Sequence, residues 1–221
     1  MSKQTVVIGL GQFGMSLARA LAANGGEVLA VDINPAHIHD IAPHVADAVL
    51  MDAMDDEALA AIAPARRDTC VCAIGDDNRE GSIIVTALLK QLGAKHIVAR
   101  ATDDLHMRIL TLVGADEVIN PERSYGERLA VRLAWRNVVN VMPLGGDLVL
   151  TEVVAPESFW GRTLLELALP KRFGVTVSAV RRVRDSVVHA SIPDPLAAIE
   201  EGDILMLVST EAAARKLTER S

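Results

Sequence analysis

The sequence has few aromatic residues and no cluster of basic ones. Phe, Trp and Tyr make up 3% of its 221 residues, and 29 Asp and Glu residues outnumber 22 Lys and Arg residues, which gives a formal charge of -7. Proteins that bind nucleic acid present a basic patch, often with aromatic rings for stacking. The composition therefore argues against nucleic acid as a partner.

A long hydrophobic run is also missing. The start, MSKQTVVIGLG, has one lysine and a short apolar stretch that leads directly into a glycine-rich segment, unlike a signal peptide or a membrane-spanning helix. No later segment is long enough to span a membrane. We therefore expect a cytoplasmic protein, and such a protein can still dock on a membrane protein.

Cysteine is scarce: only Cys70 and Cys72 occur, in the segment TCVCAIGDD. The segment is typical of a β-strand, in which alternation points both sulfur atoms to one face. A C-x-C pair is open to interpretation as a metal or redox site. Without further cysteines, two small buried hydrophobic side chains are the favoured interpretation.

Half of the residues are hydrophobic, and their pattern is regular as far as residue 120. Short β-branched runs alternate with helix-like stretches, a pattern typical of a parallel sheet with helices on both faces. We predict an α/β fold with a Rossmann-like, doubly wound parallel sheet over residues 1–121. The expected strands are TVVIG, EVLAVD, DAVLM, TCVCAIG, HIVAR and DEVIN, and the expected helices cover residues 12–24, 35–42, 54–62, 79–92 and 103–113.

The second half of the chain has a different pattern. The stretch ERSYGERLAVRLAWRNVVNV after Pro121 is typical of an amphipathic helix, and MPLGGD then ends it. We therefore predict a linker helix and hinge over residues 122–144. Strand-like runs with two helix candidates follow, which predicts a small α+β domain over residues 145–221.

Three glycines, Gly9, Gly11 and Gly14, stand between the first strand and the first helix. Glycines at these offsets allow a tight turn, bring backbone N–H groups close to a phosphate and let the helix pack on the strand. Asp32 follows at the end of the second strand, where a carboxylate accepts hydrogen bonds from ribose hydroxyls. The pattern predicts a bound nucleotide diphosphate. An aspartate disfavours the 2'-phosphate of NADP but leaves NAD, ADP and ATP open.

Catalytic residues for a dehydrogenase are hard to find. Residues 145–221 contain no Cys or Tyr, a single histidine, His189, and only two lysines, Lys171 and Lys216. Tyr125 lacks a lysine four residues later, so the Tyr-x-x-x-Lys pair is missing too. A dehydrogenase needs a proton donor or a residue at the hydride site, usually from a second domain, so we predict that the protein is not an enzyme.

Several segments together resemble a known family. VVIGLGQFG, VLAVDINP, VCAIGDDNREGSII and VGADEVINPERSYG, followed by RFGVTVSAV and EEGDILMLVS, are similar to the RCK-domain (TrkA-N plus TrkA-C) regulatory subunits of Ktr and Trk potassium uptake systems. The resemblance covers nearly the whole chain. It implies a cytoplasmic subunit that forms homodimers and an octameric ring, peripheral at the inner face of the membrane on a membrane-embedded potassium channel subunit.

The resemblance also implies a ligand. In Ktr-type relatives ATP and ADP drive the switch, whereas Trk-type relatives also bind NAD or NADH, so an NAD(H)-sensing regulator remains an alternative, with an NAD-dependent oxidoreductase as the less favoured one. A divalent cation, Mg²⁺ or Ca²⁺, would bind beside the terminal phosphates through Glu122, which matches a family glutamate that is contributed across the subunit interface. The residues expected around the nucleotide are Gly9, Gly11, Gln12, Phe13, Gly14, Asp32, Ile33, Asn34, Asp52, Ala53, Gly75, Asp76 and Arg100.

Some of these residues have simpler explanations. The acids of residues 55–57 are also typical of a solvated helix cap, and Arg100 of a surface ion pair. Glu122 is equally compatible with a first-turn acid that the helix dipole favours. His37, His39 and His44 suggest a metal cluster at first sight, but neighbouring helical positions point to different faces, which favours a solvated helix.

Three positions depart from the family pattern. Gln12 stands where many Ktr regulators have an arginine that reaches the terminal phosphate, and a neutral amide supplies no charge. Met54 replaces a threonine after the third strand. Pro170 stands where relatives that bind cyclic di-AMP carry an arginine, so we do not expect cyclic di-AMP to bind.

Overall fold

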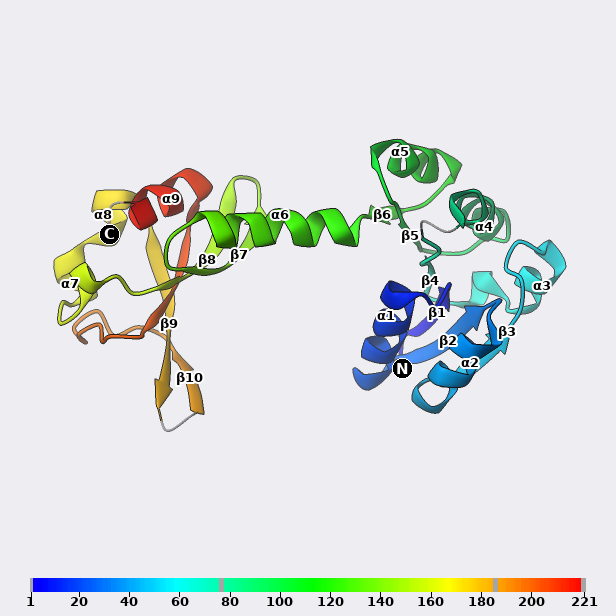
Figure 1. Cartoon of the computed structure of the whole chain (residues 1–221), viewed down its shortest axis with the longest axis horizontal. Coiled ribbons are helices and arrows are strands. Elements are labelled where there is room, and N and C mark those ends of the chain that lie inside the picture. The colour runs from blue at the N-terminus through cyan, green and yellow to red at the C-terminus, as the bar shows by residue number, and fades with distance from the viewer. Residues whose placement is uncertain (1, 76–77, 185–186, 220–221) are drawn as a thin grey trace. The chain divides into compact units, whose positions relative to one another are not determined.

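A computed structural model describes residues 2–75, 78–184 and 187–219. The chain divides into two compact units, Met1–Glu122 and Arg123–Ser221. Figure 1 labels the elements of both. Across the described ranges, we find no helix that combines the length and the apolar character needed to cross a membrane.

The first unit is built on a six-stranded parallel sheet with the order β3-β2-β1-β4-β5-β6. The order reverses beside β1, which is the arrangement of a dinucleotide-binding fold and confirms the predicted doubly wound sheet. Each run that the sequence pattern assigned to a strand forms one. The strands are β1 (Gln4–Ile8), β2 (Glu27–Asp32), β3 (Asp47–Leu50), β4 (Thr69–Cys72), β5 (Ile97–Arg100) and β6 (Glu117–Ile119).

Helices cover both faces of this sheet (Figure 1). Ala18 and Ile41 pack with Val7 on the face covered by α1 and α2, whereas Leu59, Leu89 and other residues of α3, α4 and α5 pack on the opposite face. Alternate residues of each strand therefore enter different cores. The helices are α1 (Gln12–Ala23), α2 (Pro35–Ile41), α3 (Asp56–Ala61), α4 (Arg79–Gln91) and α5 (Asp104–Val113), with short 3-10 turns η1 (Ala42–His44) and η2 (Pro64–Arg66).

Cys70 and Cys72 lie on one face of β4, as the alternation predicts, and both are unpaired thiols buried in the core. Burial raises the pKa of each thiol to about 11. The Sγ atoms lie 3.9 Å from the Pro64 carbonyl oxygen and 3.6 Å from the Ser82 carbonyl oxygen. The two cysteines thus act as small core side chains.

The folded protein should therefore resist thiol reagents. With a pKa near 11, about one thiol in a thousand is ionised near pH 8, and the thiolate is the reactive species. We expect no reaction with Ellman's reagent on the time scale of the denatured control and two thiols per chain after denaturation. Rapid labelling of the folded protein would show that β4 opens readily.

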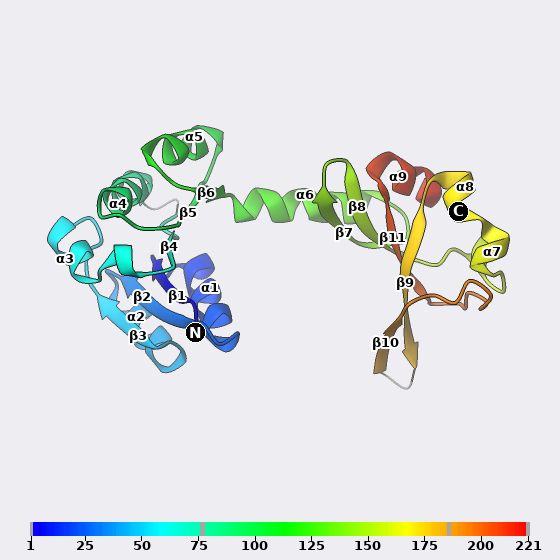
Figure 2. The same cartoon turned by 180° about the vertical axis from the view of Figure 1, so that it is seen from behind.

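The second unit contains a five-stranded antiparallel sheet with the order β10-β9-β11-β8-β7. Figure 2 shows β11 between β8 and β9. Leu205 and Leu207 of β11 pack with Leu167, Leu169 and Leu217 from the helices. The elements are α6 (Pro121–Ala134), which begins at the end of the first unit, β7 (Val138–Gly145), β8 (Leu148–Val154), η4 (Glu157–Phe159), α7 (Leu164–Leu167), α8 (Leu169–Phe173), β9 (Thr176–Arg184), β10 (Val187–Ser191), β11 (Ile204–Thr210) and α9 (Glu211–Glu219).

One sequence-based expectation needs correction in this region. The helix expected to continue to Val141 ends at Ala134. Strand β7 takes up the end of that predicted helix and most of the predicted break, and it pairs with β8. Asn137 adopts a positive φ of 60° and turns the chain into the strand. The β-branched residues that follow, beginning with Val138, favour a strand over a helix.

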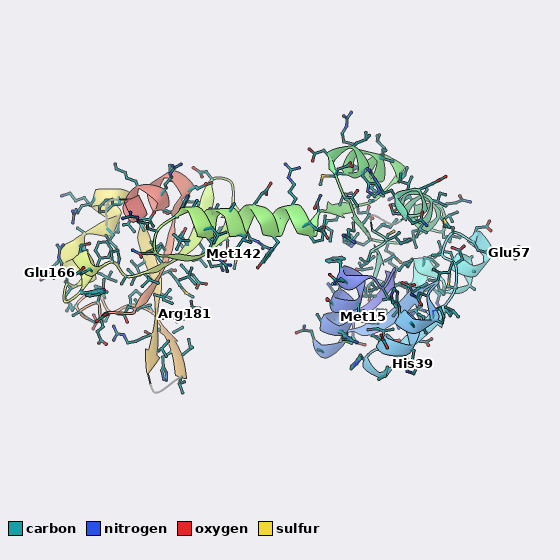
Figure 3. All side chains as sticks on the ribbon, viewed as in Figure 1. Met15, His39, Glu57, Met142, Glu166 and Arg181 are labelled. Atoms are coloured by element: carbon teal, nitrogen blue, oxygen red, sulfur yellow. The ribbon has the colours of Figure 1, made fainter. Side chains whose placement is uncertain are left out.

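Ion pairs between arginines and carboxylates stabilise this second sheet. Arg182 of β9 donates to both oxygens of Asp203, a fully buried carboxylate, and this pairing raises the pKa of the Arg182 guanidinium. Arg181, labelled in Figure 3, pairs with Glu152 of β8 at 2.6 Å. A buried carboxylate is tolerated when it is paired in this way.

Candidate functional site

A cavity of about 490 Å³ opens at the carboxyl ends of the parallel strands, beside the point where the strand order reverses. Ligands of open α/β sheets bind at this place, and the volume suits a small molecule. The glycine loop after β1, the end of β2, the loops after β3 and β4, and the end of β5 all contribute. The lining residues are Ile8, Gly9, Gly11, Gln12, Phe13, Val31, Asp32, Ile33, Asn34, His37, Met51, Ala53, Ala73, Ile74, Gly75, Asn78, Arg100 and Glu122.

The three motif glycines have different structural roles. Gly9 has a φ of +90°, and a Cβ there would lie 2.9 Å from the Ile74 nitrogen. A Cβ on Gly14 would overlap the carbonyl oxygen of Gly9, so this glycine brings α1 against the end of β1. A Cβ on Gly11 would meet no atom within 4 Å. Gly9 and Gly14 are therefore required by packing, whereas Gly11 leaves space that a ligand can use.

The N-terminus of α1 faces the cavity through Gln12 and Phe13, which line it. The N-cap residue is Gly11, no side chain of the described residues caps the helix, and its first turn has no acidic residue. The first N–H groups of a helix lack intrahelical partners and carry partial positive charge. The helix start can therefore bind a phosphate or another anion.

Asp32 ends β2 with its carboxylate at the rim of the cavity. Oδ2 accepts a 2.5 Å hydrogen bond from the Leu10 N–H, and Oδ1 accepts a 2.7 Å bond from the Asn34 N–H. Nδ1 of His37 lies 3.3 Å from Oδ2. A carboxylate has about four acceptor positions, so Asp32 can hold the glycine loop and still accept bonds from ligand hydroxyls.

Arg100 extends from the end of β5 into the same cavity. Its Nη2 donates to Oε1 of Glu122 at 2.5 Å, and its guanidinium lies 5.9 Å from the centre of the Phe13 ring. A Cβ on Gly75 would collide with the guanidinium, so Gly75 provides the room that Arg100 occupies. The buried Nε of Arg100 has no hydrogen-bond acceptor within residues 2–75, 78–184 and 187–219.

Most of the residues that the sequence predicts for the site line this cavity. Gly14 and Asp52 do not line the cavity. Oδ1 of Asp52 accepts a hydrogen bond from the Met54 N–H. Asp76 lies outside the described residues. Asp55, for which the sequence left a helix cap open, does cap α3 by accepting bonds from Glu57 and Ala58 N–H groups.

Sequence reasoning missed two polar residues of the cavity, His37 and Asn78. The helix pattern placed His37 on a solvated helix, and it did not show that the first turn of α2 lies beside Asp32. Asn78 caps α4 through its bond to the Gly81 N–H. A signal for His37 was available, because it lies in the first turn of a helix that Pro35 opens three positions after Asp32.

Among the described residues, Glu122 brings a carboxylate to the side of this cavity where Arg100 lies. Its side chain is 60% exposed and offers hard oxygen ligands of the kind that Mg²⁺ and Ca²⁺ prefer. The described part of the chain contains no group of three or more His, Cys, Asp or Glu side chains that could hold a metal ion. A cation bound to Glu122 would have ligand positions left for oxygens of a bound phosphate and for water.

Comparison with known families agrees with the fold. The TrkA-N domain profile matches residues 5–121, and the TrkA-C domain profile matches residues 148–221. The chain belongs to the TrkA-N and TrkA-C family. Strand β7 lies before the matched TrkA-C segment yet pairs with the TrkA-C sheet.

Two whole-length relatives of this TrkA-family protein are potassium uptake proteins. Ktr system potassium uptake protein C of Bacillus subtilis (strain 168) is 33% identical over 222 residues, which cover 100% of this chain and 98% of the relative. Ktr system potassium uptake protein A of Vibrio alginolyticus is 35% identical over 209 residues, which cover 95% of this chain and 93% of the relative. These matches confirm the resemblance drawn from the sequence.

A solved structure shares the fold. The GsuK channel bound to NAD superposes with a TM-score of 0.66 at 17% identity and covers 96% of this chain. The match spans 38% of that channel chain, so the two proteins share this part of the architecture only.

Proposed function

We propose that this TrkA-family protein is the nucleotide-sensing regulatory subunit of a potassium uptake system. The observation that carries the proposal is the cavity, in which a glycine loop, an uncapped helix start, Asp32 and Arg100 face one space. The names of the whole-length relatives supply the process, potassium uptake. We propose no catalytic role for the cavity residues.

The ligand that this arrangement supports best is ADP or ATP. The ribose hydroxyls would bond to Asp32, the phosphates would lie over the glycine loop and the start of α1, and Arg100 would bind a phosphate oxygen. Ile33, Asn34 and Ala53 line the same cavity and would contact the adenosine. These roles are proposals for this chain.

Gating requires that the ligand bind two shapes of the assembly unequally, because equal affinity shifts no equilibrium. Each factor of ten between the two affinities contributes about 1.4 kcal/mol. A terminal phosphate together with a cation at Glu122 distinguishes ATP from ADP. We propose that ATP stabilises the shape that opens the membrane subunit.

The cation role of Glu122 leads to a direct prediction. Mg²⁺ should raise the affinity for ATP about tenfold, an effect typical of a charge partly exposed to solvent, and change the affinity for ADP less than twofold. Calorimetric titration in Mg²⁺ and in chelator measures both. Equal ATP affinity in the two buffers would contradict the cation role.

Gln12 favours a second candidate, an NAD(H)-sensing regulator of the same kind of membrane subunit. Gln12 lies at the start of α1 and brings no positive charge to the terminal phosphate. A dinucleotide has no terminal phosphate and needs no such charge. The GsuK channel bound to NAD has the same fold in this region.

The partner we propose is a membrane-embedded potassium channel subunit, with this protein bound at its cytoplasmic face as homodimers in an octameric ring. Vesicles that contain a Ktr-type or Trk-type membrane subunit test the proposal. Adding this protein with ATP should raise potassium flux over the flux with ADP. Flux that does not respond to the protein with any nucleotide would contradict the regulatory function.

A further inference from the structure

Arg100 and Glu122 form an ion pair inside the cavity, and the two side chains differ in freedom. The Arg100 side chain is 14% exposed, lies over Phe13 and fills the space left by Gly75. Glu122 is 60% exposed and lies in the first turn of α6. The guanidinium is therefore held in place, and the carboxylate is the partner with room to move.

A phosphate that enters the cavity would use the same guanidinium. Guanidinium groups bind carboxylates and phosphates through the same planar fork of N–H donors. While Glu122 accepts from Nη2, a phosphate that approaches Arg100 meets a carboxylate of like charge. Phosphate binding to Arg100 therefore weakens the pair, and the released carboxylate lies close to the phosphates.

Building on the proposed nucleotide site, we infer that Glu122 competes with the γ-phosphate of ATP for Arg100, and that a divalent cation relieves this competition by binding the released carboxylate. Glu122 thus lowers the affinity for ATP when no cation is present and raises it when a cation is bound. The exchange takes place at the start of α6, the helix that leads from the first unit into the second.

The competition predicts that losing an acidic side chain tightens binding. In chelator, Glu122→Gln should bind ATP about fivefold more tightly than the parent, because a partly exposed ion pair no longer opposes the phosphates. The gain from Mg²⁺ should fall below twofold. Adenosine has no phosphate, so its affinity should not change.

The matched control is Glu127→Gln on the same helix. Glu127 is also an exposed glutamate paired with an arginine, Arg123, at 2.9 Å, and it does not line the cavity. Its removal changes the net charge as Glu122→Gln does, so it should leave ATP affinity within twofold of the parent. Circular dichroism melts establish that the variants are folded.

A double-mutant cycle separates competition from simple charge repulsion. In an Arg100→Gln background Glu122 no longer has its ion-pair partner. Its exposed carboxylate then turns to solvent, where its repulsion of the phosphates is screened. Glu122→Gln should then tighten ATP binding less than twofold in chelator. Arg100→Met serves as the background if Arg100→Gln does not fold, because methionine fills similar space without a charge that could pair with Glu122.

The outcomes are distinguishable. If Glu122→Gln tightens ATP binding in chelator equally in the parent and in the Arg100 variant, or in neither, the competition is wrong while the nucleotide site stands. If the parent binds neither ATP nor ADP in either buffer, the nucleotide site and the competition are both wrong. Tighter ATP binding by Glu122→Gln only when Arg100 is present supports the competition.

Discussion

Replacing Asp32 by alanine is expected to lower the affinity for ADP at least about 100-fold, a loss of about 3 kcal/mol. The change removes the ribose acceptor and leaves the N–H groups of Leu10 and Asn34 without their partner oxygens. An unpaired polar group in a partly buried place costs about 1–3 kcal/mol. Calorimetric titration with ADP measures the loss.

The control for this change is Asp40→Ala. Asp40 is an exposed acid on α2 that does not line the cavity, so its loss should leave ADP affinity within twofold of the parent. Asp32→Asn keeps one acceptor oxygen and should give an intermediate affinity. Binding of ADP by Asp32→Ala within threefold of the parent would show that the carboxylate is not a ligand.

Gly14→Ala is expected to destabilise the first unit by about 3 kcal/mol, at the upper end of overpacking costs. The added Cβ would overlap the Gly9 carbonyl oxygen. Neither atom can move by a change of side-chain rotamer, because the backbone fixes the position of each. The start of α1 must then move off the end of β1. Urea unfolding followed by circular dichroism measures the loss in the free energy of unfolding.

Gly11→Ala is the matched control, because it adds the same methyl group to a glycine of the same loop where there is room for it. Its Cβ meets no atom within 4 Å, so stability should change by less than about 0.5 kcal/mol. The same Cβ occupies space beside the proposed phosphates and should lower ADP affinity about tenfold. Equal stability of the Gly14 and Gly11 variants would contradict the packing role assigned to Gly14.

The sequence predicts the first unit well because local and global signals agree there. β-branched runs, helix caps and the glycine loop each mark an element, and the parallel strands bring their carboxyl ends to one edge. Residues as distant as Gly9, Asp32 and Arg100 could therefore be assigned to one site from strand ends alone.

Strand β7 shows why the second unit was harder to predict. Pro143 and Gly145 are typical of a break, and proline is excluded from the centre of a sheet. β7 is an edge strand, where a proline is tolerated, and its pairing with β8 shifts register between Pro143 and Gly145. Edge position depends on the tertiary fold and is not visible in the local pattern.

The ion pair between Arg100 and Glu122 is a second feature that the local sequence pattern could not predict. Each residue could be assigned to the phosphate end of the site, but 22 positions separate them in sequence. They meet because Arg100 pairs in register with Ile119 of β6, just before the start of α6. Side-chain geometry at adjacent strand ends decides this contact.

The most direct test of the account is a calorimetric titration of the whole chain with ATP, ADP, NAD⁺ and NADH, each with Mg²⁺ and with chelator. The account predicts tight binding of ATP and ADP, with a cation effect on ATP. Tight binding of NADH with weak binding of ATP would contradict an ATP and ADP switch and assign the cavity to a dinucleotide.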